Sequence, residues 1–170
     1  MVVWIIGLSG AGKTTLARAV TEQIRSTGVN AVLIDGDAIR EIFGNDLGHS
    51  LEDRKRNADR ICRLCKFLDE EGIHVVCAIL SLFPESRSWN RQNLKRYYEV
   101  YIDVPIEDLI VRDAKGIYGR YLRGEIRDVA GMDLAFPPPD EADLVIRNTE
   151  SKEALLRHAR LIADKVVEGA

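Results

Sequence analysis

Apolar and polar positions along the chain fall into two kinds of block. Short runs rich in Val, Ile and Leu alternate with longer stretches in which apolar side chains recur every third or fourth residue. The short runs predict strands at residues 2–6, 31–34, 73–80, 100–104 and 144–146. The longer stretches predict helices at residues 13–26, 38–43, 51–71, 85–97, 106–113 and 152–167.

The order of these blocks predicts the fold class. Strands that are apolar along their whole length are typical of a sheet covered by helices on both faces. Regular alternation of strand and helix favours parallel pairing with right-handed crossovers. We therefore expect an α/β fold, a doubly wound parallel sheet of about five strands with helices on both faces, in one domain over residues 1–170.

One long stretch, residues 115–139, departs from the alternation. It has poor apolar periodicity, several glycines and basic residues, and three consecutive prolines near its end. A segment of this length within a compact domain is more often a functional lid than a structural loop. We expect a mobile lid here, with a solvated surface excursion as the alternative.

Composition contributes mainly exclusions. The chain has 24 Lys and Arg against 27 Asp and Glu, a formal charge of −3, which argues against a nucleic-acid coating protein. It contains no apolar run long enough to span a membrane and no signal-peptide pattern. Cys62 and Cys65 lie on an apolar helical pattern, with no second pair to complete a zinc site. We expect a cytoplasmic protein with reduced cysteines, and neither nucleic acid nor membrane as a partner.

The strongest chemical signal follows the first predicted strand. There the pattern G-x-x-x-x-G-K-[ST] is matched at every fixed position, by Gly7-Leu8-Ser9-Gly10-Ala11-Gly12-Lys13-Thr14. Its glycines allow a tight turn whose N–H groups point at phosphate oxygens, and the following helix adds its dipole. Lys13 can reach the β- and γ-phosphates, and the Thr14 hydroxyl can ligate Mg²⁺. The motif makes the expected α/β fold one of the P-loop NTPase type. No guanine-reading N-K-x-D motif occurs, so we expect ATP and Mg²⁺ as cofactors, held by residues 7–15, including Thr15.

Two carboxylates, Asp35 and Asp37, follow the second predicted strand. Strand ends in an open α/β sheet face the ligand crevice, so both are expected near the phosphate-binding loop. A carboxylate there can accept the proton of an acceptor hydroxyl, or hold Mg²⁺ directly or through water. Capping of the next helix is the alternative for Asp37, and the two roles are compatible. Arg40, one turn further on, suits a phosphate or sulfate group.

Further motifs follow in order: Asp35-Gly36-Asp37-x-Ile39-Arg40, Asp46-Leu47-Gly48-x-Ser50-x-x-Asp53-Arg54-x-x-Asn57, Val104-Pro105, Arg112-Asp113-x-Lys115-Gly116-x-Tyr118, Gly124-Glu125-Ile126 and Gly131. With the phosphate-binding loop, they resemble the adenylylsulfate (APS) kinase family over most of the chain. The resemblance implies a small-molecule kinase that transfers the γ-phosphoryl group of ATP to the ribose 3′-hydroxyl of adenylyl sulfate. It also implies Mg²⁺ and a homodimer.

The resemblance assigns roles by position. Asp37 is expected to engage the acceptor hydroxyl and, with Thr14, the metal, while Lys13 and the lid residue Lys115 assist transfer. Two arginines, Arg112 and Arg120, join the ATP-binding set. The nucleotide substrate is assigned to Asp35, Asp37, Arg40, His49, Arg54, Asn57, Ser81, Leu82, Lys115 and Val129. Taken without the motif, Arg54 belongs to a solvated basic face, which is the alternative for that residue.

Two positions depart from the family pattern. Relatives carry phenylalanines that sandwich the substrate adenine, and this chain has His49 and Val129 there. Because stacking contributes on the order of 1–3 kcal/mol per base, their loss predicts weaker purine selectivity. Either another residue such as Phe136 replaces the rings, or the acceptor is a smaller pyrimidine nucleotide such as cytidine diphosphoramidate. A regulatory nucleotide-binding module without transfer activity is a third hypothesis, which the presence of Asp37 and Lys13 disfavours.

Overall fold

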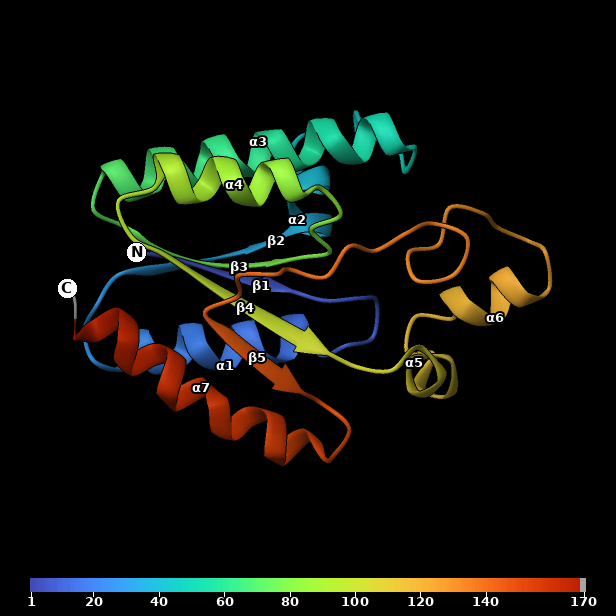
Figure 1. Cartoon of the computed structure of the whole chain (residues 1–170). Coiled ribbons are helices and arrows are strands. Elements are labelled where there is room, and N and C mark those ends of the chain that lie inside the picture. Colours follow the sequence, from blue (N-terminus) through green and yellow to red (C-terminus); the bar gives the residue numbers. More distant parts are fainter. Residues whose placement is uncertain (169–170) are drawn as a thin grey trace.

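Five parallel strands form the centre of the protein in the computed structural model, which describes residues 1–168 (Figure 1). The strands are β1 (Val2–Ile6), β2 (Ala31–Asp35), β3 (His74–Ile79), β4 (Tyr97–Asp103) and β5 (Leu144–Arg147). Their order across the sheet is β2-β3-β1-β4-β5, and every neighbouring pair is parallel. The predicted α/β class and parallel sheet are confirmed.

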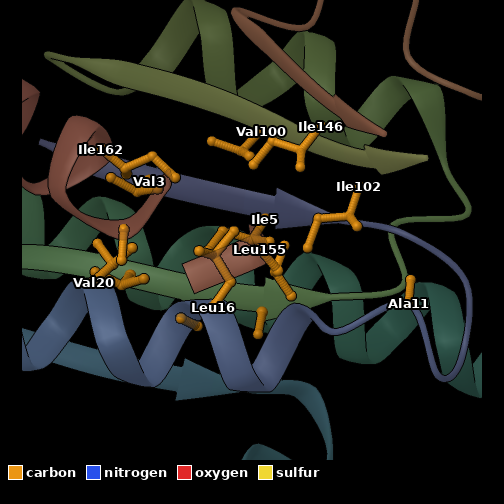
Figure 2. Packing of buried hydrophobic residues seen from close by; sticks show 14 of the residues in the cluster. Val3, Ile5, Ala11, Leu16, Val20, Val100, Ile102, Ile146, Leu155 and Ile162 are labelled. Carbon is orange, nitrogen blue, oxygen red and sulfur yellow. The ribbon is translucent and has the colours of Figure 1, made fainter. Parts of the chain in front are cut away.

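Helices cover both faces of the sheet because the strands present apolar side chains to both sides. Val3 and Ile5 of β1 pack against α1 (Lys13–Ser26) and α7 (Lys152–Val167), as Figure 2 shows. The intervening Trp4 faces the opposite layer. That layer contains α2 (Gly36–Ile42), α3 (Leu51–Glu70) and α4 (Pro84–Asn93) (Figure 1).

Helix ends follow from local capping chemistry. Ser50 begins α3, where its side chain accepts a hydrogen bond from the N–H of Asp53. Ser151 begins α7 in the same way, accepting from the N–H of Ala154. Pro84 occupies the first turn of α4, where the missing N–H has no partner to lose.

The predicted helix 85–97 was wrong at its end. Helix α4 stops at Asn93, and Tyr97 already belongs to β4. Leu94 is extended and buried, and the N–H of Lys95 donates to the carboxylate of Asp69, 2.7 Å away. These contacts direct the chain toward the sheet, although the apolar periodicity of residues 94–97 is compatible with a helix.

The segment predicted as a lid lies beyond the carboxyl ends of the strands, next to α5 (Ile106–Arg112) (Figure 1). It contains a short helix, α6 (Ile117–Leu122), that the weak periodicity did not predict. Tyr118 in α6 is 1% exposed and packs in the core, so this end of the segment is anchored.

The core also accounts for the cysteines. Cys62, Cys65 and Cys77 are free and buried between α3 and the sheet, as predicted for the helical pair. Within residues 1–168, no helix combines the length and apolar character needed to cross a membrane.

Candidate functional site

The predicted phosphate-binding loop connects β1 to α1 at the carboxyl edge of the sheet. Gly12 precedes α1 with a left-handed backbone (φ 102°), and a Cβ there would lie 2.7 Å from Cδ2 of Leu155. At Gly7, a Cβ would lie 2.9 Å from the carbonyl oxygen of Ile102. Both glycines are therefore required by close packing of the loop on β4 and α7.

Lys13 is folded back over this loop. Its Nζ donates to the carbonyl oxygen of Leu8 at 2.8 Å. Burial, together with the positive charge of Lys115, lowers the pKa of Lys13 to about 8, against the opposing pull of Asp35 and Asp37. An ammonium group in this environment gains strongly from a bound polyphosphate.

Thr14 and Asp35 meet beside the loop. The Thr14 hydroxyl donates to Oδ2 of Asp35 at 2.8 Å, and Oδ1 of Asp35 accepts from the N–H of Asp37. Asp35, and not Asp37, therefore caps α2, which corrects the capping role considered for Asp37. The hydroxyl and carboxylate oxygens are hard donors of the kind that Mg²⁺ prefers, so this corner fits the metal chemically.

Asp37 is thereby free for another partner. Its Oδ2 lies 3.0 Å from Nζ of Lys115, which belongs to the segment predicted as a lid, and both side chains are exposed. Burial works to raise the pKa of Asp37, but the hydrogen bond and charge of Lys115 outweigh it, and the net pKa lies below its ordinary value. Two of the residues assigned to catalysis are thus in direct contact.

Arg40 of α2 and Asn57 of α3 have unused hydrogen-bonding capacity. Nη1 of Arg40 and Oδ1 of Asn57 are buried without a partner among residues 1–168. Nδ2 of Asn57 donates to the carbonyl oxygen of Gly36, beside the two carboxylates. Buried groups without a partner are costly, and these two could bind a polar ligand beside Asp35 and Asp37.

Arg54 connects the two positions that depart from the family pattern. Its Nε donates to the carbonyl oxygen of His49 at 2.7 Å, and its Nη2 donates to that of Asp128 at 3.0 Å. Val129, next in the chain, is 6% exposed, and the carboxylate of Asp133 accepts from its N–H. His49 is exposed. Arg54 is therefore bound to both segments and is not the free member of a solvated basic face.

Ser81 and Leu82 lie buried in the loop after β3. Ser81 has a left-handed backbone (φ 57°), and its hydroxyl oxygen accepts from Nε1 of Trp4 at 3.2 Å. The hydroxyl keeps its proton for donation. Phe136, considered as a replacement ring, packs against Tyr101 with centroids 6.2 Å apart.

The remaining predicted ATP contacts are more scattered. Arg112 at the end of α5 donates through Nη2 to the carbonyl oxygen of Asn148 at 2.7 Å. Arg120 is half exposed and pairs with Glu125 inside the lid, with Nε 3.7 Å from the carboxylate. Their predicted contacts with ATP stay predictions.

Three residues of this edge had no assigned role. The Tyr118 hydroxyl donates to the carbonyl oxygen of Ser9, and Nδ2 of Asn148 donates to that of Ala11, both at 2.9 Å. Buried Arg87 donates through Nη1 to the carbonyl oxygens of Ser81 and Pro137. Each of the three binds a backbone carbonyl at least 50 positions away in sequence, a type of contact that leaves no motif.

The parallel sheet, the phosphate-binding loop and the facing carboxylates define a P-loop kinase. The adenylylsulphate kinase family model matches residues 1–147, and the chain belongs to that family. A cytidine diphosphoramidate kinase of Campylobacter jejuni is 41% identical over 151 residues, covering 87% of this chain and 86% of the relative. The adenylyl-sulfate kinase of Chloroflexus aurantiacus is 40% identical over 147 residues, covering 86% and 79%.

A solved structure extends the similarity to the whole fold. The APS kinase of Mycobacterium tuberculosis, in complex with AMPPNP and APS, is 30% identical, with a TM-score of 0.88. The match covers 98% of this chain and 96% of that one. The chain is thus a kinase of the APS kinase type that uses ATP.

Proposed function

We propose that this protein transfers the γ-phosphoryl group of ATP to the ribose 3′-hydroxyl of a nucleotide whose phosphate carries a further group. The observation that carries the proposal is the contact between Asp37 and Lys115 beside the loop that holds Lys13 and Thr14. A hydroxyl placed over Asp37 has a carboxylate to accept its proton and cations to neutralise the migrating phosphoryl group.

The chain's own residues divide the work between donor and acceptor. The loop N–H groups and Lys13 hold the donor phosphates, and Arg40, Asn57 and Arg54 hold the phosphate end of the acceptor. The acceptor hydroxyl hydrogen-bonds Asp37 in place of Lys115, which is then free to face the transferred group. Catalysis in this arrangement consists mainly of positioning and charge neutralisation.

Magnesium belongs to the same proposal. Thr14 and Asp35, with Asp37 directly or through water, would hold it next to the donor phosphates. When bound, the ion neutralises charge on the phosphate oxygens.

Cytidine diphosphoramidate is favoured as acceptor over adenylyl sulfate. The positions that carry the stacking rings in APS kinases are exposed His49 and buried Val129, and neither offers a ring comparable to phenylalanine. Arg54 holds both segments, so the two positions flank the same part of the crevice. The similarity to the Campylobacter jejuni relative supports this choice.

The test is Mg-ATP turnover with each acceptor separately, measured as ADP release and product mass. We expect a higher kcat/KM for cytidine diphosphoramidate, with the product heavier by one phosphoryl group. Higher efficiency with adenylyl sulfate would reassign the acceptor, and no turnover with either would refute the proposal.

The family resemblance further leads us to propose a cytoplasmic homodimer.

A further inference from the structure

Two carbonyl groups of the phosphate-binding loop are held by side chains from outside it. The Tyr118 hydroxyl donates to the carbonyl oxygen of Ser9, and Nδ2 of Asn148 donates to that of Ala11, each at 2.9 Å. Tyr118 comes from α6 in the lid, and Asn148 follows β5. The loop is therefore fixed from two sides by segments more than 100 residues further along the chain.

Fixing a carbonyl group also fixes the N–H group of the next residue. In a planar trans peptide, the C=O and N–H bonds point in opposite directions, and the described residues contain no cis peptide. The N–H groups of Gly10 and Gly12 must therefore point away from Tyr118 and Asn148. Within residues 1–168, neither N–H group has a hydrogen-bond partner, so both remain available to an anion.

The glycines make this fixing necessary. Gly10 and Gly12 have φ angles of 78° and 102°, and glycine readily visits both halves of φ space. Rotation of either peptide plane would turn a carbonyl oxygen toward the phosphates in place of an N–H. A hydrogen bond on the outer side opposes that rotation.

The two donors are themselves rigidly placed. Tyr118 is 1% exposed, and its N–H donates to Oδ1 of Asp113 at 3.0 Å. Burial, followed by the charge of Asp113, raises the pKa of Tyr118 to about 12, so its hydroxyl remains a donor at neutral pH. The backbone of Asn148 is held by the carbonyl oxygen of Asp103 and by Arg112.

We propose that Tyr118 and Asn148 are positioning residues that keep the peptides after Ser9 and Ala11 oriented for polyphosphate binding. The inference rests on ATP as the donor but not on the identity of the acceptor. It also links the lid to the donor site, because Tyr118 and Lys115 belong to the same segment.

The test compares Tyr118→Phe and Asn148→Leu with the wild-type chain. Each removes one donor while keeping most of the side-chain volume, and Tyr98→Phe is the matched control. Tyr98 lies on β4, and its hydroxyl makes no hydrogen bond within residues 1–168. Calorimetric titration with Mg-ATP and with Mg-tripolyphosphate reports on the loop directly. Tripolyphosphate lacks a nucleoside, so this measurement is independent of turnover and of the proposed acceptor.

We expect a 5- to 20-fold weaker Kd for both ligands in each variant, as suits the loss of about one hydrogen bond. In both variants the KM for ATP should rise, while the KM for the acceptor should stay within twofold of wild type. In the control Tyr98→Phe, the Kd for both ligands and both KM values should stay within twofold of wild type. Unchanged tripolyphosphate affinity in both variants would overturn the proposal. So would parallel losses for donor and acceptor with a lower Tm, since these would indicate a purely structural role.

Discussion

The donor and acceptor sides of this crevice are built in different ways. The phosphate-binding loop packs on the core, where Gly12 lies against Leu155. Two carbonyl groups of the loop accept hydrogen bonds from Tyr118 and Asn148. The acceptor side depends on exposed Asp37 and Lys115 and on Arg54, which reaches between two loops. One side is fixed by packing, and the other by a few polar contacts.

This difference explains how one family can use different acceptors. A change on the donor side disturbs the core and the chemistry together. In the proposed function, a change at position 49 or 129 would alter the surroundings of the base and leave Asp37 and Lys13 in place. We infer that specificity can vary at the exposed position 49 at little cost to the fold, whereas a change at buried position 129 also affects packing.

The sharpest test of this division is Asp37→Ala. It should reduce kcat by about 10²- to 10⁴-fold, because it removes the group that we propose accepts the hydroxyl proton. Since Asp37 is exposed, Tm should change little, and the affinity for ATP measured without Mg²⁺ should stay within about threefold. Asp164→Ala is the control, because it breaks an exposed ion pair with Arg160 on α7. Normal turnover in Asp37→Ala would contradict its role.

Gly12→Ala should affect stability and ATP binding together. A methyl group would meet Leu155 at 2.7 Å in a left-handed backbone, so we expect a loss of about 1–3 kcal/mol in unfolding free energy. ATP affinity should fall by about 10- to 100-fold because the loop must shift.

The matched control for that prediction is Gly28→Ala. Gly28 has a similar φ of 84°, but a Cβ there would have no atom within 4 Å. It should lose about 1 kcal/mol of stability and no ATP affinity. Equal effects of the two variants on ATP binding would contradict the packing argument.

Local patterns in the sequence predicted most of the fold and the donor loop. Continuous apolar runs predicted the five strands, which the structure contains. A contiguous motif predicted the phosphate-binding loop with Lys13 and Thr14. Non-local contacts were not predictable in this way. The end of α4 depends on Asp69 binding the N–H of Lys95, and α6 gains its packing from Tyr118 in the core. Neither interaction produces a periodicity in its own segment.

The candidate site shows the same limit. Asp35 and Asp37 were both predicted at the crevice, but only the structure assigns the cap to Asp35 and leaves Asp37 to Lys115. The contacts of Tyr118 and Asn148 with loop carbonyls join residues 109 and 137 positions apart. Such side-chain-to-backbone bonds depend on geometry and impose little on the surrounding sequence.

Restoring rings on the acceptor side gives a smaller, more selective effect. His49→Phe should improve kcat/KM for adenylyl sulfate relative to cytidine diphosphoramidate by about tenfold, because stacking contributes about 1–3 kcal/mol. Its stability should be unchanged, since His49 is exposed. Val129→Phe should shift the ratio similarly but lose about 1–3 kcal/mol of stability, because Val129 is buried. A constant acceptor ratio in both variants would show that these positions do not contact the base.

The smallest predicted effect is the pH dependence of ATP binding, which concerns Lys13 on the donor side. The pKa of Lys13 is lowered to about 8 by burial, so in the free protein the side chain loses its proton as the pH rises above 8. Bound phosphates favour the charged form, so ATP binding should take up a proton there, and affinity should fall by at most about tenfold per pH unit. Calorimetry between pH 7.5 and pH 9.5, in buffers of different ionisation enthalpy, measures both effects. Lys13→Arg, whose guanidinium stays charged, should bind ATP with no such decline, whereas an equal decline in both proteins would assign the titration to a group other than Lys13.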